Sequence, residues 1–251
     1  MARTVAGKAL TEQHYRSQVG LRALALQDYI KLWPLWEGDE RTFRRLVEAA
    51  VVLARVYYQL SSSLGAAYFQ AFRVAEDPGG QAPPILADPM AEDRLISSLY
   101  ETGQFSLQRS LDAGKSPQVA MDTALTNTSG AMSTHIVDGG RGTLLRSIGA
   151  DSKAGGWSRV TSGNPCAFCA MLASRGPVYL TEDSAEFEAH GHCSCTAEPG
   201  YEGTTWPGRS REFHDLYNEA TLEALEAGDL QRGTSNDLLN AFRRRYEKQR
   251  P

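Results

Sequence analysis

The sequence predicts an α+β protein that is mostly α-helical, with a helical N-terminal region, a small cysteine-rich module that contains β-strands, and a helical C-terminal tail. Two observations predict this class. Apolar residues recur every three or four positions along much of residues 1–150 and again in residues 206–251, which is the spacing of amphipathic helices. Between these regions, short β-like segments alternate with turn residues, and residues 164–195 contain all four cysteines of the chain.

The composition is that of a globular protein. Hydrophobic residues make up 41% and charged residues 22% of the 251 positions, an ordinary balance for a chain that can bury a sizeable core. The net charge of −4 gives no overall basic field that would attract nucleic acid. The apolar runs are far shorter than the roughly 20 residues of a membrane span, and the N-terminus lacks the apolar core of a signal peptide. We therefore expect a protein made and used in the cytoplasm, or carried inside an assembly.

The N-terminal region contains two predicted helices. Apolar residues at helical spacing predict the first between Thr11 and Trp36, where Pro34 and Gly38 interrupt the pattern. The second begins with the acidic residue Asp39 and continues as one long helix to the "EDPGG" segment. We expect its aromatic residues to pack in the core or against partner helices: Tyr57, Tyr58, Tyr68, Phe69 and Phe72.

The middle of the chain predicts a linker followed by two or three helices. Proline and glycine mark residues 75–89 as exposed linker, and Ser116–Pro117 has the residue types of an N-cap and first helical position. The glycines of "GGRGTLLR" predict a hinge rather than a phosphate-binding loop, and "DSKAGGW" predicts a second hinge. "WSRVTSGNPCAFC" and "RGPVYLTED" are β-like, and the residues after Trp206-Pro207 return to helix with a basic end.

These segments predict five parts. They are an N-terminal helical region (1–75), a linker (76–89), a helical segment (90–150), a cysteine and histidine module (151–205) and a helical C-terminal tail (206–251).

The cysteines have the spacing of a metal site. A C-x-x-C pair on a tight turn is followed, about two dozen residues later, by "HGHCSC", and structural zinc sites usually combine two such short pairs into four sulfur or nitrogen ligands. The predicted zinc ligands are Cys166, Cys169, His192 and Cys195, with Cys193 and His190 as alternates. In a β-like turn residues 193 and 195 point the same way, which makes Cys193 with Cys195 the main competing choice.

Three other interpretations of the cysteines remain open. They could form a disulfide-linked hairpin, pack as small apolar residues, or supply a thiolate nucleophile to which His190, His192, His135 or His214 acts as base. No orienting third group accompanies such a pair, and the chain contains no G-x-S-x-G, P-loop or H-E-x-x-H motif. We therefore assign no catalytic residue and regard an enzyme as the less favoured class.

The stretch "GWSRVTSGNPCAFCAMLASRGPVY…FEAHGHCSC", with its lead-in over residues 140–160, resembles the MuF-like minor head proteins of tailed phages, the phage head morphogenesis family, in the version found in actinobacterial phages. In that pattern Arg159 is the arginine of the strand, Cys166 and Cys169 are the first pair, and His192, Cys193 and Cys195 form the closing signature. Many members close with "HPxCRC", whereas this chain has "HGHCSC", so either histidine could fill the family position.

The resemblance implies a minor capsid protein that acts in head morphogenesis. Its partners would be the portal protein, scaffold or major capsid protein, and possibly packaged DNA, with no membrane in the assembled head. The implied location is the host bacterial cytoplasm during assembly and then the interior of the virion head. Relatives of the actinobacterial type are often labelled capsid maturation proteases, which makes a protease that processes scaffold or coat protein the alternative function.

Overall fold

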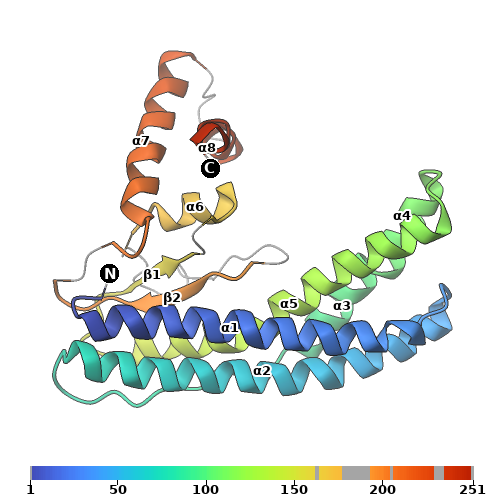
Figure 1. Cartoon of the computed structure of the whole chain (residues 1–251), viewed down its shortest axis with the longest axis horizontal. Helices are drawn as coiled ribbons and strands as arrows, with labels where there is room; N and C mark the ends of the chain where they lie inside the picture. The colour runs from blue at the N-terminus through green and yellow to red at the C-terminus, as the bar shows by residue number, and fades with distance from the viewer. Residues whose placement is uncertain (1, 162–163, 177–192, 204–205, 229–234, 250–251) are drawn as a thin grey trace.

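The computed structural model describes residues 2–161, 164–176, 193–203, 206–228 and 235–249. It confirms a mostly α-helical α+β protein, and in these described residues one two-stranded sheet lies between the long helices and α6 (Figure 1). In chain order the elements are α1 (Val5–Leu32), the 3-10 helix η1 (Trp33–Leu35), α2 (Glu40–Glu76), α3 (Glu92–Thr102), α4 (Gln104–Asp112), α5 (Pro117–Ala150), β1 (Trp157–Val160), α6 (Ala167–Ala173), β2 (Thr196–Pro199), α7 (Ser210–Glu226) and α8 (Ser235–Gln249). The β-like segment predicted at "RGPVYLTED" lies mostly outside the described residues.

Helices α1, α2 and α5 lie side by side and form the long body of the molecule (Figure 1). Side chains cap their N-termini as the sequence indicates. The Asp39 carboxylate accepts the Thr42 backbone N–H at 2.9 Å, and Ser116 accepts that of Val119 with Pro117 in the first turn. Such caps replace hydrogen bonds that the first helical turn cannot make internally. The first helix starts earlier than predicted because Thr4, which accepts the Gly7 N–H, caps it.

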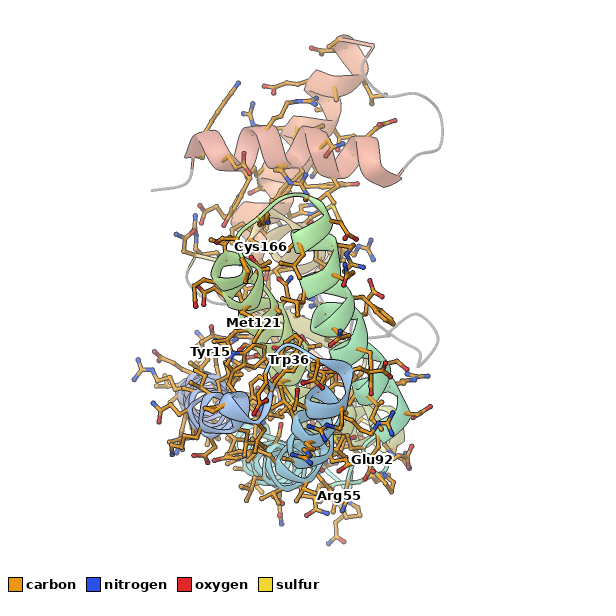
Figure 2. All side chains as sticks on the ribbon, turned by 90° about the vertical axis from the view of Figure 1, so that its right-hand side faces the viewer. Tyr15, Trp36, Arg55, Glu92, Met121 and Cys166 are labelled. Carbon is orange, nitrogen blue, oxygen red and sulfur yellow. The ribbon has the colours of Figure 1, made fainter. Side chains whose placement is uncertain are left out.

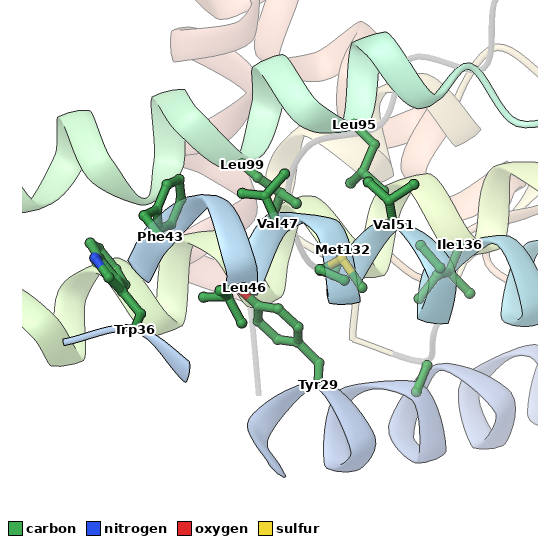
Figure 3. Packing of buried hydrophobic residues seen from close by; sticks show 14 of the residues in the cluster. Tyr29, Trp36, Phe43, Leu46, Val47, Val51, Leu95, Leu99, Met132 and Ile136 are labelled. Atoms are coloured by element: carbon green, nitrogen blue, oxygen red, sulfur yellow. The ribbon is translucent and has the colours of Figure 1, made fainter. Parts of the chain in front are cut away.

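The core of this body gathers apolar side chains from helices α1 to α5 and the η1 turn. Figure 3 shows a part of it: Tyr29, Trp36, Phe43, Leu46, Val47, Val51, Leu95, Leu99, Met132 and Ile136. Most of these side chains are fully buried, and their burial against one another supplies the main driving force for packing α1, α2, α3 and α5. The aromatic residues predicted to pack do so, with Tyr68, Phe69 and Phe72 buried and Tyr57 and Tyr58 half-buried.

The predicted hinge at residues 139–142 is wrong. These residues lie inside the continuous helix α5, where small side chains let α2 come close. A Cβ atom on Gly139 would lie 2.3 Å from the Tyr58 carbonyl oxygen, and one on Gly65 would lie 2.8 Å from the Gly140 carbonyl oxygen. Glycine's local preference against helix is therefore outweighed by the tertiary contact that it permits.

Residues 77–91 connect α2 to α3 without helix or strand. This segment runs along α5, where the Ser147 hydroxyl accepts the Ile85 N–H and the Thr143 hydroxyl accepts the Ala87 N–H. Ordered hydrogen bonds therefore fix part of the stretch that the sequence predicts as linker.

Strands β1 and β2 pair antiparallel in the register Trp157↔Pro199 to Val160↔Thr196. The sheet packs across α1 and α5 through polar contacts as well as apolar ones. The Thr11 hydroxyl donates to Glu198 at 2.6 Å, and the His14 Nε2 atom contacts the Thr196 hydroxyl at 3.1 Å. Segments far apart in the chain are thus joined at this end of the body.

A further apolar cluster holds α6, α7 and α8 together, with Phe213, Phe242 and Tyr246 at its centre. These helices stand away from the long body, and α6 lies next to the sheet (Figure 1). The predicted return to helix after residue 207 is confirmed. No helix in the described part of the chain combines the length and apolar character needed to cross a bilayer.

Candidate metal centre

The cysteines approach one another from two short segments. Cys166 caps helix α6 and Cys169 lies in its first turn, whereas Cys193 and Cys195 directly precede β2. The C-x-x-C pair was expected on a tight turn, but it lies at the start of a helix because the alanine-rich run that follows favours helix. Cys166 keeps an extended backbone there, and its Sγ atom accepts the Cys169 N–H at 3.4 Å. Figure 2 places Cys166 well apart from Arg55 and Glu92, an ion pair on the body.

Three of the thiols form a buried cluster. The Sγ atoms of Cys169, Cys193 and Cys195 all lie within 4.8 Å of one another, and those of Cys169 and Cys193 are 3.5 Å apart. These side chains are 3%, 3% and 5% exposed. Cys166 is half-buried and packs against the same cluster together with Phe168. The structure therefore holds a group of thiols that could bind a metal ion.

The cluster contains part of the predicted ligand set. It brings together Cys166, Cys169 and Cys195, and it adds Cys193, which the sequence analysis placed among the alternates. His190 and His192 lie outside the described residues. The choice of ligand set therefore remains a prediction, but the described geometry places Cys193 at the centre of the group.

Two buried arginines lie beside the thiols. Arg141, on α5, donates from Nε to the Cys195 carbonyl oxygen and from Nη2 to that of Cys193, both at 3.0 Å. Its Nη1 atom donates to Asp138 at 2.8 Å. Arg159, the arginine of the predicted strand, lies on β1 and is 2% exposed. Arg141 therefore fixes the backbone of the C-x-C segment to the helical body.

Sequence reasoning missed Arg141. It lies within "GGRGTLLR", which reads locally as a flexible glycine segment. One signal was present, namely a single cation in a run of small and apolar residues that could continue a helix. A charged residue in such a position is buried only when it has partners.

The pKa values show how the thiols interact. Hydrogen bonds with Cys166, Cys193 and Cys195, together with burial, raise the pKa of Cys169, whereas hydrogen bonds from Cys169 and Cys195 lower the pKa of Cys193. The hydrogen bond with Cys169 favours the Cys195 thiolate, but contact with Cys193 and burial outweigh it and raise the pKa of Cys195 to about 12. Closely spaced thiols cannot all ionise without a cation among them.

The chain matches the VG15 protein family over residues 6–220, which include the helical body, the cysteine cluster and both arginines. It belongs to the VG15 family. It is also similar to the Gene 15 protein of Mycobacterium phage D29, with 29% identity over 127 aligned residues and a match that covers 36% of this chain and 46% of the relative. The chain thus spans about half the length of this curated relative. No solved structure matches the chain.

In this VG15 protein the cluster has the chemistry of a soft-metal site more than that of a nucleophile. Buried thiolates within a few ångströms of one another suit Zn²⁺. A catalytic thiolate needs an adjacent base, and the described histidines contact other groups. His14 contacts Thr196, His135 contacts the Ser98 hydroxyl, and His214 contacts the Ser174 carbonyl oxygen and Asn218.

Proposed function

We propose that this VG15 protein is a MuF-like minor capsid protein that acts in phage head morphogenesis. The observation that carries the proposal is the extent of the family match, which runs from residue 6 to residue 220 and so includes both the helical body and the cysteine cluster. The phage relative adds support for a role in the virion. The proposed partners are the portal protein, scaffold or major capsid protein, and the proposed location is the head interior.

The shape of the body supports an assembly role. An elongated bundle can lie along larger subunits, and helix α2 presents an apolar row, Val52, Val56 and Leu60, one turn apart. These side chains are 59%, 52% and 47% exposed. Residues spaced by four lie on one face of a helix, so the row offers a continuous surface against which a subunit of the head could pack.

The proposal is tested by co-expressing the chain with the portal, scaffold and major capsid proteins of the same phage and isolating procapsids by sedimentation. Wild-type protein is expected in the procapsid fraction at a few copies per particle. The Val56→Asp variant should be lost from that fraction. Val74→Asp is the matched control, because Val74 lies near the C-terminal end of the same helix and is 76% exposed. Absence of the wild-type protein from procapsids would refute the proposal.

The same experiment separates the alternative, a capsid maturation protease. The buried thiol cluster supplies a candidate nucleophile in Cys193, but that side chain is only 3% exposed, which leaves a substrate carbonyl little access. A protease would change the mass of scaffold or coat protein in the co-expression, and Cys193→Ser would abolish that change without altering helical content. An unchanged mass spectrum of the coat and scaffold proteins would leave the assembly role as the explanation.

A further inference from the structure

We propose that Cys166, Cys169, Cys193 and Cys195 bind one Zn²⁺ ion as an all-thiolate set, and that the buried guanidinium groups of Arg141 and Arg159 supply its countercharge. The geometry of the cysteines and arginines supports this site independently of the proposed function. The proposed ligand set differs from the one that the sequence favours, because Cys193 takes the place of His192.

The spacing of the sulfur atoms fits the ion. Zinc–sulfur bonds of about 2.3 Å in tetrahedral geometry place the sulfurs about 3.8 Å apart. The Cys169 and Cys193 sulfurs are 3.5 Å apart, and those of Cys169, Cys193 and Cys195 all lie within 4.8 Å of one another. An ion at their centre therefore needs only small movements of the side chains.

Cys166 supplies the fourth ligand. It packs against the three buried thiols, and its sulfur accepts the N–H of Cys169 in the first turn of α6. Cys166 is also the most exposed of the four cysteines, which gives an ion a route of entry to the cluster.

The arginines match the charge of such a site. Four thiolates around Zn²⁺ carry a net charge of two negative units, which is costly to bury without nearby cations. Arg141 and Arg159 are 3% and 2% exposed, and together they carry two positive charges, of which that of Arg141 is shared with the half-exposed carboxylate of Asp138. Arg141 also donates to the carbonyl oxygens of Cys193 and Cys195, so its charge is held against the two ligands that precede β2.

The arrangement makes Arg141 a positioning residue for the metal. It extends from α5 in the long body, whereas the ligands come from α6 and from the segment before β2. Metal binding would therefore link the start of α6 to the segment before β2, and the Arg141 side chain would connect this metal centre to the body. Residues that orient metal ligands commonly change metal affinity by about tenfold to a hundredfold when they are removed.

The test uses the full-length protein purified without a histidine tag or chelator, with elemental analysis for metal content and competition with a zinc chelator for the dissociation constant. We expect about one zinc per wild-type chain, little zinc in Cys193→Ser, and full occupancy in His192→Ala. Arg141→Gln should weaken zinc binding about tenfold or more. Arg146→Gln is the matched control, since Arg146 lies on the same helix, is 37% exposed and pairs with exposed Asp88.

A second measurement applies even if Cys193→Ser does not fold. Wild-type protein loaded with Co²⁺ reports its ligands in the visible spectrum, because the intensity of sulfur-to-metal charge transfer rises with the number of thiolates. Four thiolates are expected. Three thiolates together with zinc loss in His192→Ala would overturn the all-thiolate set, and a Cys169–Cys193 disulfide or bound iron in the purified protein would overturn the zinc site. Equal zinc affinity in wild type and Arg141→Gln would overturn the role of the arginines.

Discussion

The contact between α2 and α5 gives the sharpest stability prediction. Gly139 is buried on α5, and a Cβ atom there would lie 2.3 Å from the Tyr58 carbonyl oxygen of α2. Real Cβ atoms essentially never come closer than 3.0 Å to such an atom, so Gly139→Ala must separate the two helices by about 0.7 Å. Because the opposing atom belongs to the backbone, no side chain can rotate away to make room.

The size of the effect follows from two opposing terms. Overpacking a well-fitted contact costs about 1 to 3 kcal/mol. Alanine gains up to about 1 kcal/mol over glycine within a helix. Separation of the helices would also lengthen the hydrogen bond between the Ser62 and Thr143 hydroxyls, which is 2.6 Å long and buried between the same helices. Weakening this hydrogen bond costs about 1 kcal/mol and offsets the gain from alanine. We therefore expect Gly139→Ala to lower the free energy of unfolding by about 1 to 3 kcal/mol.

The assay is urea unfolding followed by far-ultraviolet circular dichroism, at equal metal content in all samples. Gly20→Ala is the matched control, because Gly20 lies on α1 and a Cβ there meets nothing within 4 Å. It should raise the free energy of unfolding by about 0.5 to 1 kcal/mol. If both variants were stabilised to a similar degree, the close approach of α2 and α5 would be refuted.

Two further predictions concern buried polar groups. Burial lowers the pKa of His14 from 6.5 to about 4, so the unfolded chain takes up a proton there more readily than the folded chain. The contribution of neutral His14 to the free energy of unfolding is therefore fully present above about pH 6.5, and up to about 3 kcal/mol of it is lost as the pH falls towards 4. His14→Gln should show a correspondingly smaller loss over this window in urea unfolding at several pH values. Asp151→Asn should lower the free energy of unfolding by about 3 kcal/mol. It removes one partner of a buried ion pair in which the Asp151 Oδ2 atom lies 2.8 Å from the Arg73 Nε atom. If Asp151→Asn unfolded at the same urea concentration as the wild type, the stabilising role of this ion pair would be contradicted.

The features of the fold that could be predicted are those with local causes. The long helix α2 begins and ends as predicted, because Asp39 caps it and the proline and glycines after residue 77 cannot continue it. Helix α5 begins at Pro117 for the same kind of reason. Its continuation through Gly139 and Gly140 could not be predicted, because the cause is the approach of α2 from a distant part of the chain.

The candidate site likewise has one part that the sequence predicts and another that depends on tertiary contacts. The short spacing of the cysteines indicates a cluster, and the structure brings these residues together. The position of Arg141 has no local signal, since its partners, the Cys193 and Cys195 carbonyl oxygens, lie more than 50 residues further along the chain. Choosing between His192 and Cys193 also requires tertiary geometry, because both residue types bind zinc equally well in principle.

The polar contacts between α1 and β2 set an order of events during synthesis. Thr11 and His14 find their partners in Glu198 and Thr196, which follow more than 180 positions later. At about 5 to 20 residues per second, a ribosome needs roughly 10 to 40 s to make the intervening chain. Strand β2 is therefore made only after helices α1 to α5, and any ion held by Cys193 and Cys195 can bind only once the whole helical body has been synthesised.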